Sequence, residues 1–74
     1  MRWMRRQRVD SESVVSAGFE PGDRMLEIEF VNGGVYRYFD VPVAVWNAFQ
    51  RADSKGRFVN FMVKPNYRFE RVDD

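Results

Sequence analysis

The stretch that decides the fold runs from residue 25 to residue 40 and reads MLEIEFVNGGVYRYFD. In its first half, three apolar residues alternate with two glutamates, and this period of two is typical of a half-buried strand. Residues 32–34, Asn-Gly-Gly, tolerate positive φ and allow the chain to reverse its direction. The pattern therefore predicts a β-hairpin with strands at residues 25–31 and 35–39.

Two registers of this hairpin place Tyr36 and Tyr38 on opposite faces of the sheet. A three-residue loop sets Tyr36 opposite Phe30 and Tyr38 opposite Ile28, and it sets the arginine between the tyrosines opposite Glu29. A two-residue turn moves both rings to the polar face. We favour the three-residue loop, because it gathers the apolar groups on one face and pairs opposite charges across the strands. It predicts that both tyrosines are largely buried against the helices.

The rest of the chain supplies two further strands and two helices. Residues 14–19 and 67–72 are expected to be strands. In the first of these strands, Val15, Ala17 and Phe19 are expected to point to the same side. Pro42 suits the start of a helix, and the helical spacing of apolar residues continues to residue 52. Ser54 is a good N-cap for a second helix at residues 55–63. The expected apolar side of that second helix is formed by Phe58, Val59, Phe61 and Met62.

The resulting fold class is α+β. The expected architecture is an antiparallel sheet of about four strands with two short helices on one face, in the order β-β-β-α-α-β. A chain of 74 residues has room for one such domain.

Composition argues against catalysis and against a bound metal or cofactor. The chain contains neither histidine nor cysteine, so the usual neutral-pH general base and the usual zinc ligands are missing. The Gly33-Gly34 pair lacks the spacing of a phosphate-binding loop. No apolar run approaches membrane-spanning length and no signal-peptide pattern is visible. We therefore expect a cytoplasmic binding protein with no membrane partner, no cofactor and no enzymatic activity.

Positive charge is concentrated at the N-terminus. Four arginines, Arg2, Arg5, Arg6 and Arg8, precede the first acidic residue, whereas residues 9–74 carry eight basic and eleven acidic side chains. The charge pattern predicts a flexible basic arm at residues 1–8, followed by a single domain at residues 9–74. Such an arm suits nucleic-acid phosphates. It is also compatible with a solvated tail, which is the interpretation that we favour.

The segment from Ser54 to Arg57 has the most site-like composition. The N-terminus of a helix offers free N–H groups, Gly56 allows close approach to the backbone, and Lys55 adds charge. Asn60 lies about one turn further on and is able to hydrogen-bond a base or a phosphate. The alternative, which we favour, is a capped helix whose Asn60 ties down a neighbouring loop.

Several blocks of this sequence together resemble the KTSC domain family. They are LEIEF at residues 26–30, Gly33, VYRY at 35–38, VP at 41–42 and SKGRFVN at 54–60. Tyr36 and Tyr38 match the family's Tyr-x-Tyr signature, which we interpret as structural. The similarity covers about residues 9–72, although the arginine-rich arm and residues 62–64 depart from the family pattern. The family is named for the C-terminus of some lysyl-tRNA synthetases, and it also occurs as small bacterial and phage proteins. The resemblance implies the fold and suggests RNA binding.

Two hypotheses about function follow. The first is a nucleic-acid-binding accessory module that uses the arm arginines together with Lys55, Arg57, Asn60, Lys64 and Arg68. The second is a protein-interaction module, with a protein partner or a second copy bound at a sheet edge or at an exposed aromatic patch. Exposed rings beside basic groups would favour nucleic acid, because unpaired bases stack on aromatic rings. An apolar patch without flanking charge would favour a protein partner.

Overall fold

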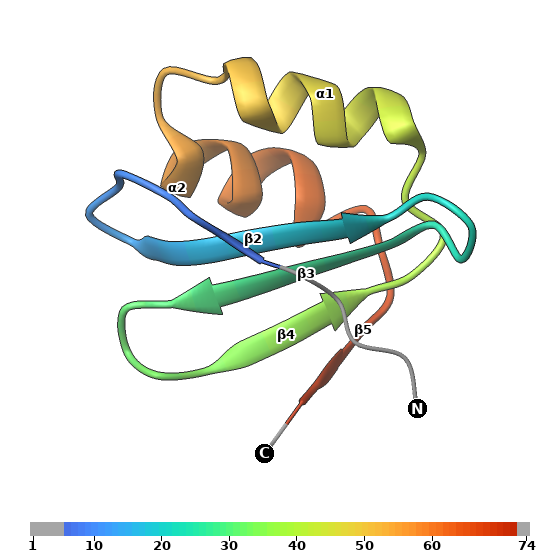
Figure 1. Ribbon diagram of the computed structural model, residues 1–74, viewed down its shortest axis with the longest axis horizontal. Coiled ribbons are helices and arrows are strands. Elements are labelled where there is room, and N and C mark those ends of the chain that lie inside the picture. The colour runs from blue at the N-terminus through green and yellow to red at the C-terminus, as the bar shows by residue number, and fades with distance from the viewer. Residues whose placement is uncertain (1–5, 73–74) are drawn as a thin grey trace.

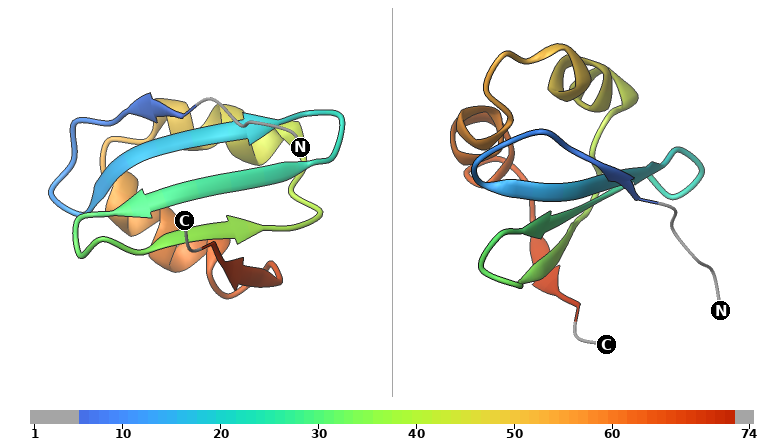
Figure 2. Two further views of the ribbon diagram at one scale, coloured as in Figure 1. Left: turned by 60° about the horizontal axis from the view of Figure 1, so that its bottom comes forward. Right: turned by 60° about the vertical axis from the view of Figure 1, so that its left-hand side comes forward.

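The computed structural model describes residues 6–72 and contains a five-stranded antiparallel sheet with the strand order β1-β2-β3-β4-β5. The helical segments cover one face of the sheet and leave the other face open (Figure 1, Figure 2). The elements are β1 (Gln7–Arg8), β2 (Val14–Glu20), β3 (Met25–Phe30), β4 (Val35–Tyr38), α1 (Val43–Arg51), α2 (Lys55–Phe58), the π-helical segment η1 (Val59–Val63) and β5 (Phe69–Arg71). The predicted α+β class and element order are confirmed, with one additional strand at the N-terminal edge.

That additional strand, β1, includes the end of the predicted arm. It pairs antiparallel with β2, with Gln7 opposite Ala17 and Arg8 opposite Ser16. Residues 7 and 8 therefore belong to the sheet and not to a flexible arm. This strand has no recognisable pattern in the sequence, because two residues are too few to reveal a period of two.

The β3–β4 hairpin has the predicted faces but a different register. Its loop is three residues long, as predicted, but it begins one residue earlier: the Phe30 N–H donates to the Gly34 carbonyl at 2.8 Å. Gly33, the last loop residue, has φ +97°, which suits glycine in this type of loop. The pairing therefore moves by two residues and sets Tyr36 opposite Ile28 and Tyr38 opposite Leu26. A shift of two keeps every side chain on its predicted face.

The core lies between the sheet and the helices. Its fully buried apolar side chains are Val14, Ala17, Leu26, Ile28, Tyr38, Val41, Phe49, Val59 and Val63. The register of β2 against β3 is irregular between Val14 and Ser16, so the chain has one extra residue there. Val14 is consequently buried beside Ala17, whereas the predicted inward residue Val15 is only half-buried.

The second helix has the predicted limits but not the predicted geometry. The Ser54 side chain accepts a hydrogen bond from the Arg57 N–H at 3.3 Å, which confirms the predicted N-cap. After Phe58 the chain continues as the π-helical segment η1. This wider turn changes which residues face inward, and Phe61 and Met62 are 71% and 50% exposed, contrary to the expected apolar side. No described helix is long and apolar enough to cross a membrane.

The open face of the sheet carries a network of charged side chains centred on Glu27. This carboxylate is only 4% exposed, because Arg6 and Arg37 form ion pairs with it from either side. Arg6 also donates to the Ser16 hydroxyl at 3.0 Å, and that hydroxyl donates to Glu29 at 2.8 Å. Arg37 therefore pairs with Glu27 and not with Glu29 as predicted, a consequence of the shift of the hairpin by two residues.

Candidate functional site

The most site-like feature of the surface is a row of aromatic rings across β3, β4 and β5. Phe30 and Tyr36 meet edge to face with centroids 5.6 Å apart, and Tyr36 meets Phe69 in the same way at 5.7 Å. We call these three residues the aromatic strip. The register explains the arrangement: Tyr38 lies opposite Phe69 across β4 and β5, with Tyr36 two residues away on the same face. The strip therefore continues the core outward to the β5 edge.

The strip is progressively exposed toward that edge. Tyr38, at the inner side of Phe69, is fully buried, whereas Phe30 and Tyr36 are half-buried. Phe69 is 53% exposed. The prediction that both tyrosines are largely buried is thus confirmed for Tyr38 and only partly for Tyr36.

Two cations lie over the rings of the strip. The Lys64 ammonium is 4.9 Å from the centroid of the Phe30 ring, and the Arg71 guanidinium carbon is 5.9 Å from the centroid of the Tyr36 ring. A cation at this distance from a ring face is held by the ring quadrupole. The strip therefore combines π-surface with positive charge, a combination typical of surfaces that bind single-stranded nucleic acid.

Burial affects the ionisation of the tyrosine next to the strip. Desolvation raises the pKa of Tyr38 to about 12 from its ordinary 10, with a smaller contribution from the neighbouring Tyr36. The Tyr38 ring supports Phe69, and the centroids of the two rings are 5.8 Å apart.

The sequence predicts one cation of this site, Lys64, but not the site itself. Lys64 was among the predicted nucleic-acid contacts, whereas Arg71 and the rings of Phe30 and Phe69 were not. The alternation of Phe69 and Arg71 on one side of the last strand was a visible signal. Only the pairing of β4 with β5 brings these residues beside Tyr36, and no local pattern fixes that pairing.

The predicted site at Ser54–Arg57 lies elsewhere, in a groove of about 470 Å³ between α2 and residues 10–13. Arg57 and Asn60 are exposed there. Gly56 is buried against Ser13, and a Cβ atom on Gly56 would lie 2.8 Å from the Ser13 hydroxyl oxygen. The glycine is therefore needed for packing. Three acidic residues also line the groove, Asp10, Glu12 and Asp53, so its electrostatic attraction for phosphate is small.

The other predicted contacts are distributed over separate parts of the molecule. Arg6 is paired with Glu27 on the open face, and Arg8 lies exposed on β1. Arg68 lies over the Phe39 ring at 5.2 Å. Arg2 and Arg5 lie outside the described residues. Among the described residues, no three acidic, histidine or cysteine side chains form a group that could hold a metal ion.

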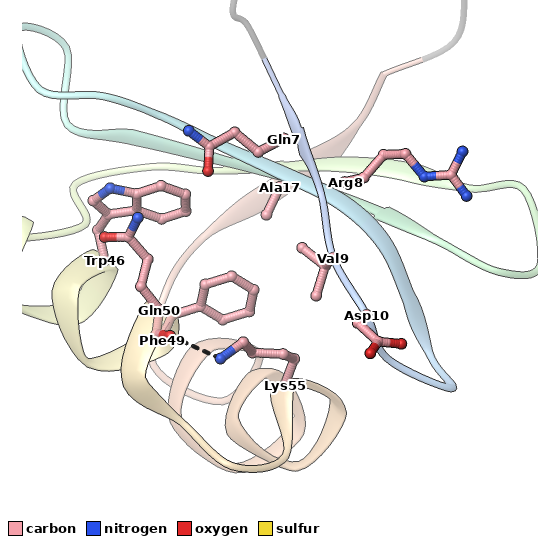
Figure 3. Close-up of a pocket in the computed structure, with 9 residues that line it drawn as sticks. All are labelled: Gln7, Arg8, Val9, Asp10, Ala17, Trp46, Phe49, Gln50 and Lys55. Carbon is pink, nitrogen blue, oxygen red and sulfur yellow. Dashed lines mark hydrogen bonds between the residues drawn. The ribbon is translucent and has the colours of Figure 1, made fainter.

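Lys55 lines both the groove between α2 and residues 10–13 and a second pocket, of about 350 Å³, under β1. Figure 3 shows the second pocket between β1 and α1, with Val9, Phe49 and Lys55 among the residues that line it. The Lys55 ammonium donates to the Gln50 carbonyl at 2.8 Å and to the Ala52 carbonyl at 2.6 Å. Lys55 therefore caps the C-terminal end of α1.

Comparison with known proteins identifies the family. The model of the KTSC domain matches residues 10–67 of this chain. The chain belongs to the KTSC domain family. A protein of Stutzerimonas stutzeri is 44% identical over 71 residues, which cover 95% of this chain and 100% of the relative. The crystal structure of a KTSC domain protein from Yersinia pestis superimposes with a TM-score of 0.92 at 38% identity, covering 96% of this chain and 100% of that one.

The family also connects this chain with much larger proteins. A lysine–tRNA ligase of a Nostoc species is 33% identical over 54 residues, which are 73% of this chain but only 10% of the ligase. This KTSC domain thus corresponds to a small part of that enzyme. The edge strands β1 and β5 lie outside the residues that the family model matches.

Proposed function

We propose that this KTSC domain is a non-catalytic module that binds single-stranded RNA through the aromatic strip. The observation that carries the proposal is the exposed Phe69 ring in a row of aromatic rings over which Lys64 and Arg71 lie. Unpaired bases stack on such rings, and each base contributes about 1–3 kcal/mol. The Lys64 ammonium, which lies over the Phe30 ring, then contacts a phosphate beside the stacked bases.

The geometry favours unpaired bases over duplex. The aromatic strip lies at the margin of the core. It exposes the ring of Phe69 at the β5 edge of the sheet. Bases inside a duplex have their faces covered by their neighbours, so that stacking on Phe69 is open only to a base that is unpaired. The relatives named as lysine–tRNA ligases act on an RNA by name, which is compatible with an RNA-binding accessory domain. Such a module would act in the cytoplasm.

The test is a titration of a short fluorescein-labelled unstructured RNA, followed by anisotropy. Phe69→Ser removes an exposed ring, and we expect it to weaken binding by about tenfold, as loss of one stacked base would. Lys64→Gln should reduce the slope of log K against log salt by about 0.7, the contribution of one phosphate contact on a single strand.

Matched controls separate the strip from the rest of the surface. Phe61→Ser removes an even more exposed ring from η1, and Arg51→Gln removes an exposed charge from α1. Both variants should bind like the parent chain. Absence of binding by the parent chain at low salt, or equal losses for Phe69→Ser and Phe61→Ser, would contradict the proposal.

A second candidate function is protein binding, and one observation favours it. Phe61 and Met62 are exposed apolar side chains on η1, and β5 presents a sheet edge to which a partner strand is able to add. If the parent chain fails to bind RNA, this surface and this edge become the next candidates, with a protein partner or a second copy as the ligand.

A further inference from the structure

The pocket under β1 is separate from the aromatic strip and has a composition of its own. It lies beside β1, whereas the strip ends at β5, the opposite edge of the sheet. Its inner wall is apolar and is formed by Val9, Ala17 and Phe49 (Figure 3). Polar side chains surround the opening, including Gln7 and Gln50. A volume of about 350 Å³ is at the small end of the range for ligand pockets.

Lys55 provides a positive charge at this pocket, which Asp10 also lines. Its ammonium carries three N–H donors, of which two are used by the carbonyls of Gln50 and Ala52. The same ammonium lies 5.7 Å from the centroid of the Phe49 ring. No carboxylate among residues 6–72 forms an ion pair with it. The charge is therefore fixed in position and retains one donor for a ligand.

We propose that this pocket binds a small monocarboxylate that carries a compact apolar group and an amide, as in an N-acylated amino acid or the C-terminal residue of a peptide. One carboxylate oxygen accepts the remaining N–H of Lys55. The apolar group packs against Val9, Ala17 and Phe49, and the amide of the ligand faces the side-chain amides of Gln7 and Gln50.

Three features select this ligand class. A single remaining donor suits one carboxylate oxygen better than a phosphate group, which requires several donors. Asp10 at the opening repels a second negative charge on the ligand. The Trp46 ring already stacks with Phe19 and Phe49, at centroid distances of 5.8 and 5.7 Å, so this pocket is poorly suited to stacking of a nucleobase.

The experiment is an NMR titration of the ¹⁵N-labelled full chain with N-acetylvaline, and separately with its uncharged analogue N-acetylvaline amide. We expect saturable shifts of the signals of Gln7, Val9 and Gln50 with the acid, and binding at least about tenfold weaker with the amide, as loss of a charge-assisted hydrogen bond implies. Because this comparison uses the unaltered protein, it does not depend on the folding of a variant.

Variants and a peptide complete the test. Lys55→Met should abolish the shifts, whereas Arg57→Met, which removes a charge from the same helix outside the pocket, should retain them. A short peptide ending in valine distinguishes the source: tighter binding than the free acid supports a peptide C-terminus, and equal binding supports a free acid. No saturable shift at millimolar acid, or equal binding of acid and amide, would overturn the proposal.

Discussion

Glu27 shows how a charged residue is accommodated inside a small β-sheet. Its side chain is on the face away from the helices, where alternation alone predicts solvent exposure. The carboxylate instead lies beneath two guanidinium groups: Arg37 donates to one oxygen from Nε at 3.2 Å and from Nη2 at 2.9 Å, and Arg6 pairs with the other oxygen. The pair with Arg6 attaches β1 to the centre of the sheet.

Replacing this carboxylate should destabilise the domain. Glu27→Gln removes the charge that both arginines share, and we expect the free energy of unfolding to fall by about 1–3 kcal/mol. Glu70→Gln is the matched control, because Glu70 also lies opposite Arg37 but is exposed, and a surface change of this kind alters stability by only about 0.5 kcal/mol. Urea denaturation of both variants measures the difference, and equal stabilities would refute the structural role of Glu27.

The burial of Tyr38 predicts a loss of stability at high pH. In the unfolded chain a tyrosine loses its proton near pH 10, whereas the folded protein holds this proton until its pKa of about 12. Between these values the unfolded state binds fewer protons, so the free energy of unfolding decreases as pH rises from about 10 to about 12. Below pH 10 this effect is absent. Denaturant melts across this range should show the decrease in the parent chain and a smaller one in Tyr38→Phe.

At the scale of elements, the second helix depends on its N-cap residue, Ser54. Ser54 occupies the N-cap with extended backbone angles, and its hydroxyl accepts the N–H of Arg57. Because α2 has only four residues before the π-helical segment begins, few other interactions hold its first turn. Ser54→Ala should therefore lower the free energy of unfolding by about 0.5–2 kcal/mol. Ser54→Asp should restore most of the stability, and a neutral effect of the alanine would show that the cap is dispensable.

The elements differ in how far the sequence predicts them. The β3–β4 hairpin and the helix limits follow from local signals: alternation, a glycine in the turn and a serine N-cap. The predicted register of the β3–β4 hairpin was wrong by two residues, because Asn32 and Gly33 fit a loop at residues 31–33 as well as one at residues 32–34. In the observed loop the Asn32 side chain accepts a hydrogen bond from the Gly34 N–H at 3.0 Å, and this bond favours the loop at residues 31–33. The π-helical turn and β1 have no local signature, since their geometry is fixed by packing and pairing with distant residues.

At the scale of the whole molecule, the sequence predicts the fold better than the site. The basic residues selected by charge alone are separated by the fold: Arg6 is used in a buried ion pair and Lys55 in a helix cap. The aromatic strip brings Phe69 of β5 beside Phe30 and Tyr36 of the β3–β4 hairpin, which lies more than thirty residues earlier in the chain. A site of this kind depends on strand order, and strand order is a tertiary property that no single segment encodes.

The most direct test of the proposed function is an NMR footprint of a short unpaired RNA on the ¹⁵N-labelled full chain. We predict that the largest changes in chemical shift fall on Phe30, Tyr36, Lys64 and the residues of β5, and that the signals of the pocket under β1 do not change. Shift changes concentrated in the groove at residues 54–60, or on the open face around Glu27, would contradict the assignment of RNA binding to the aromatic strip.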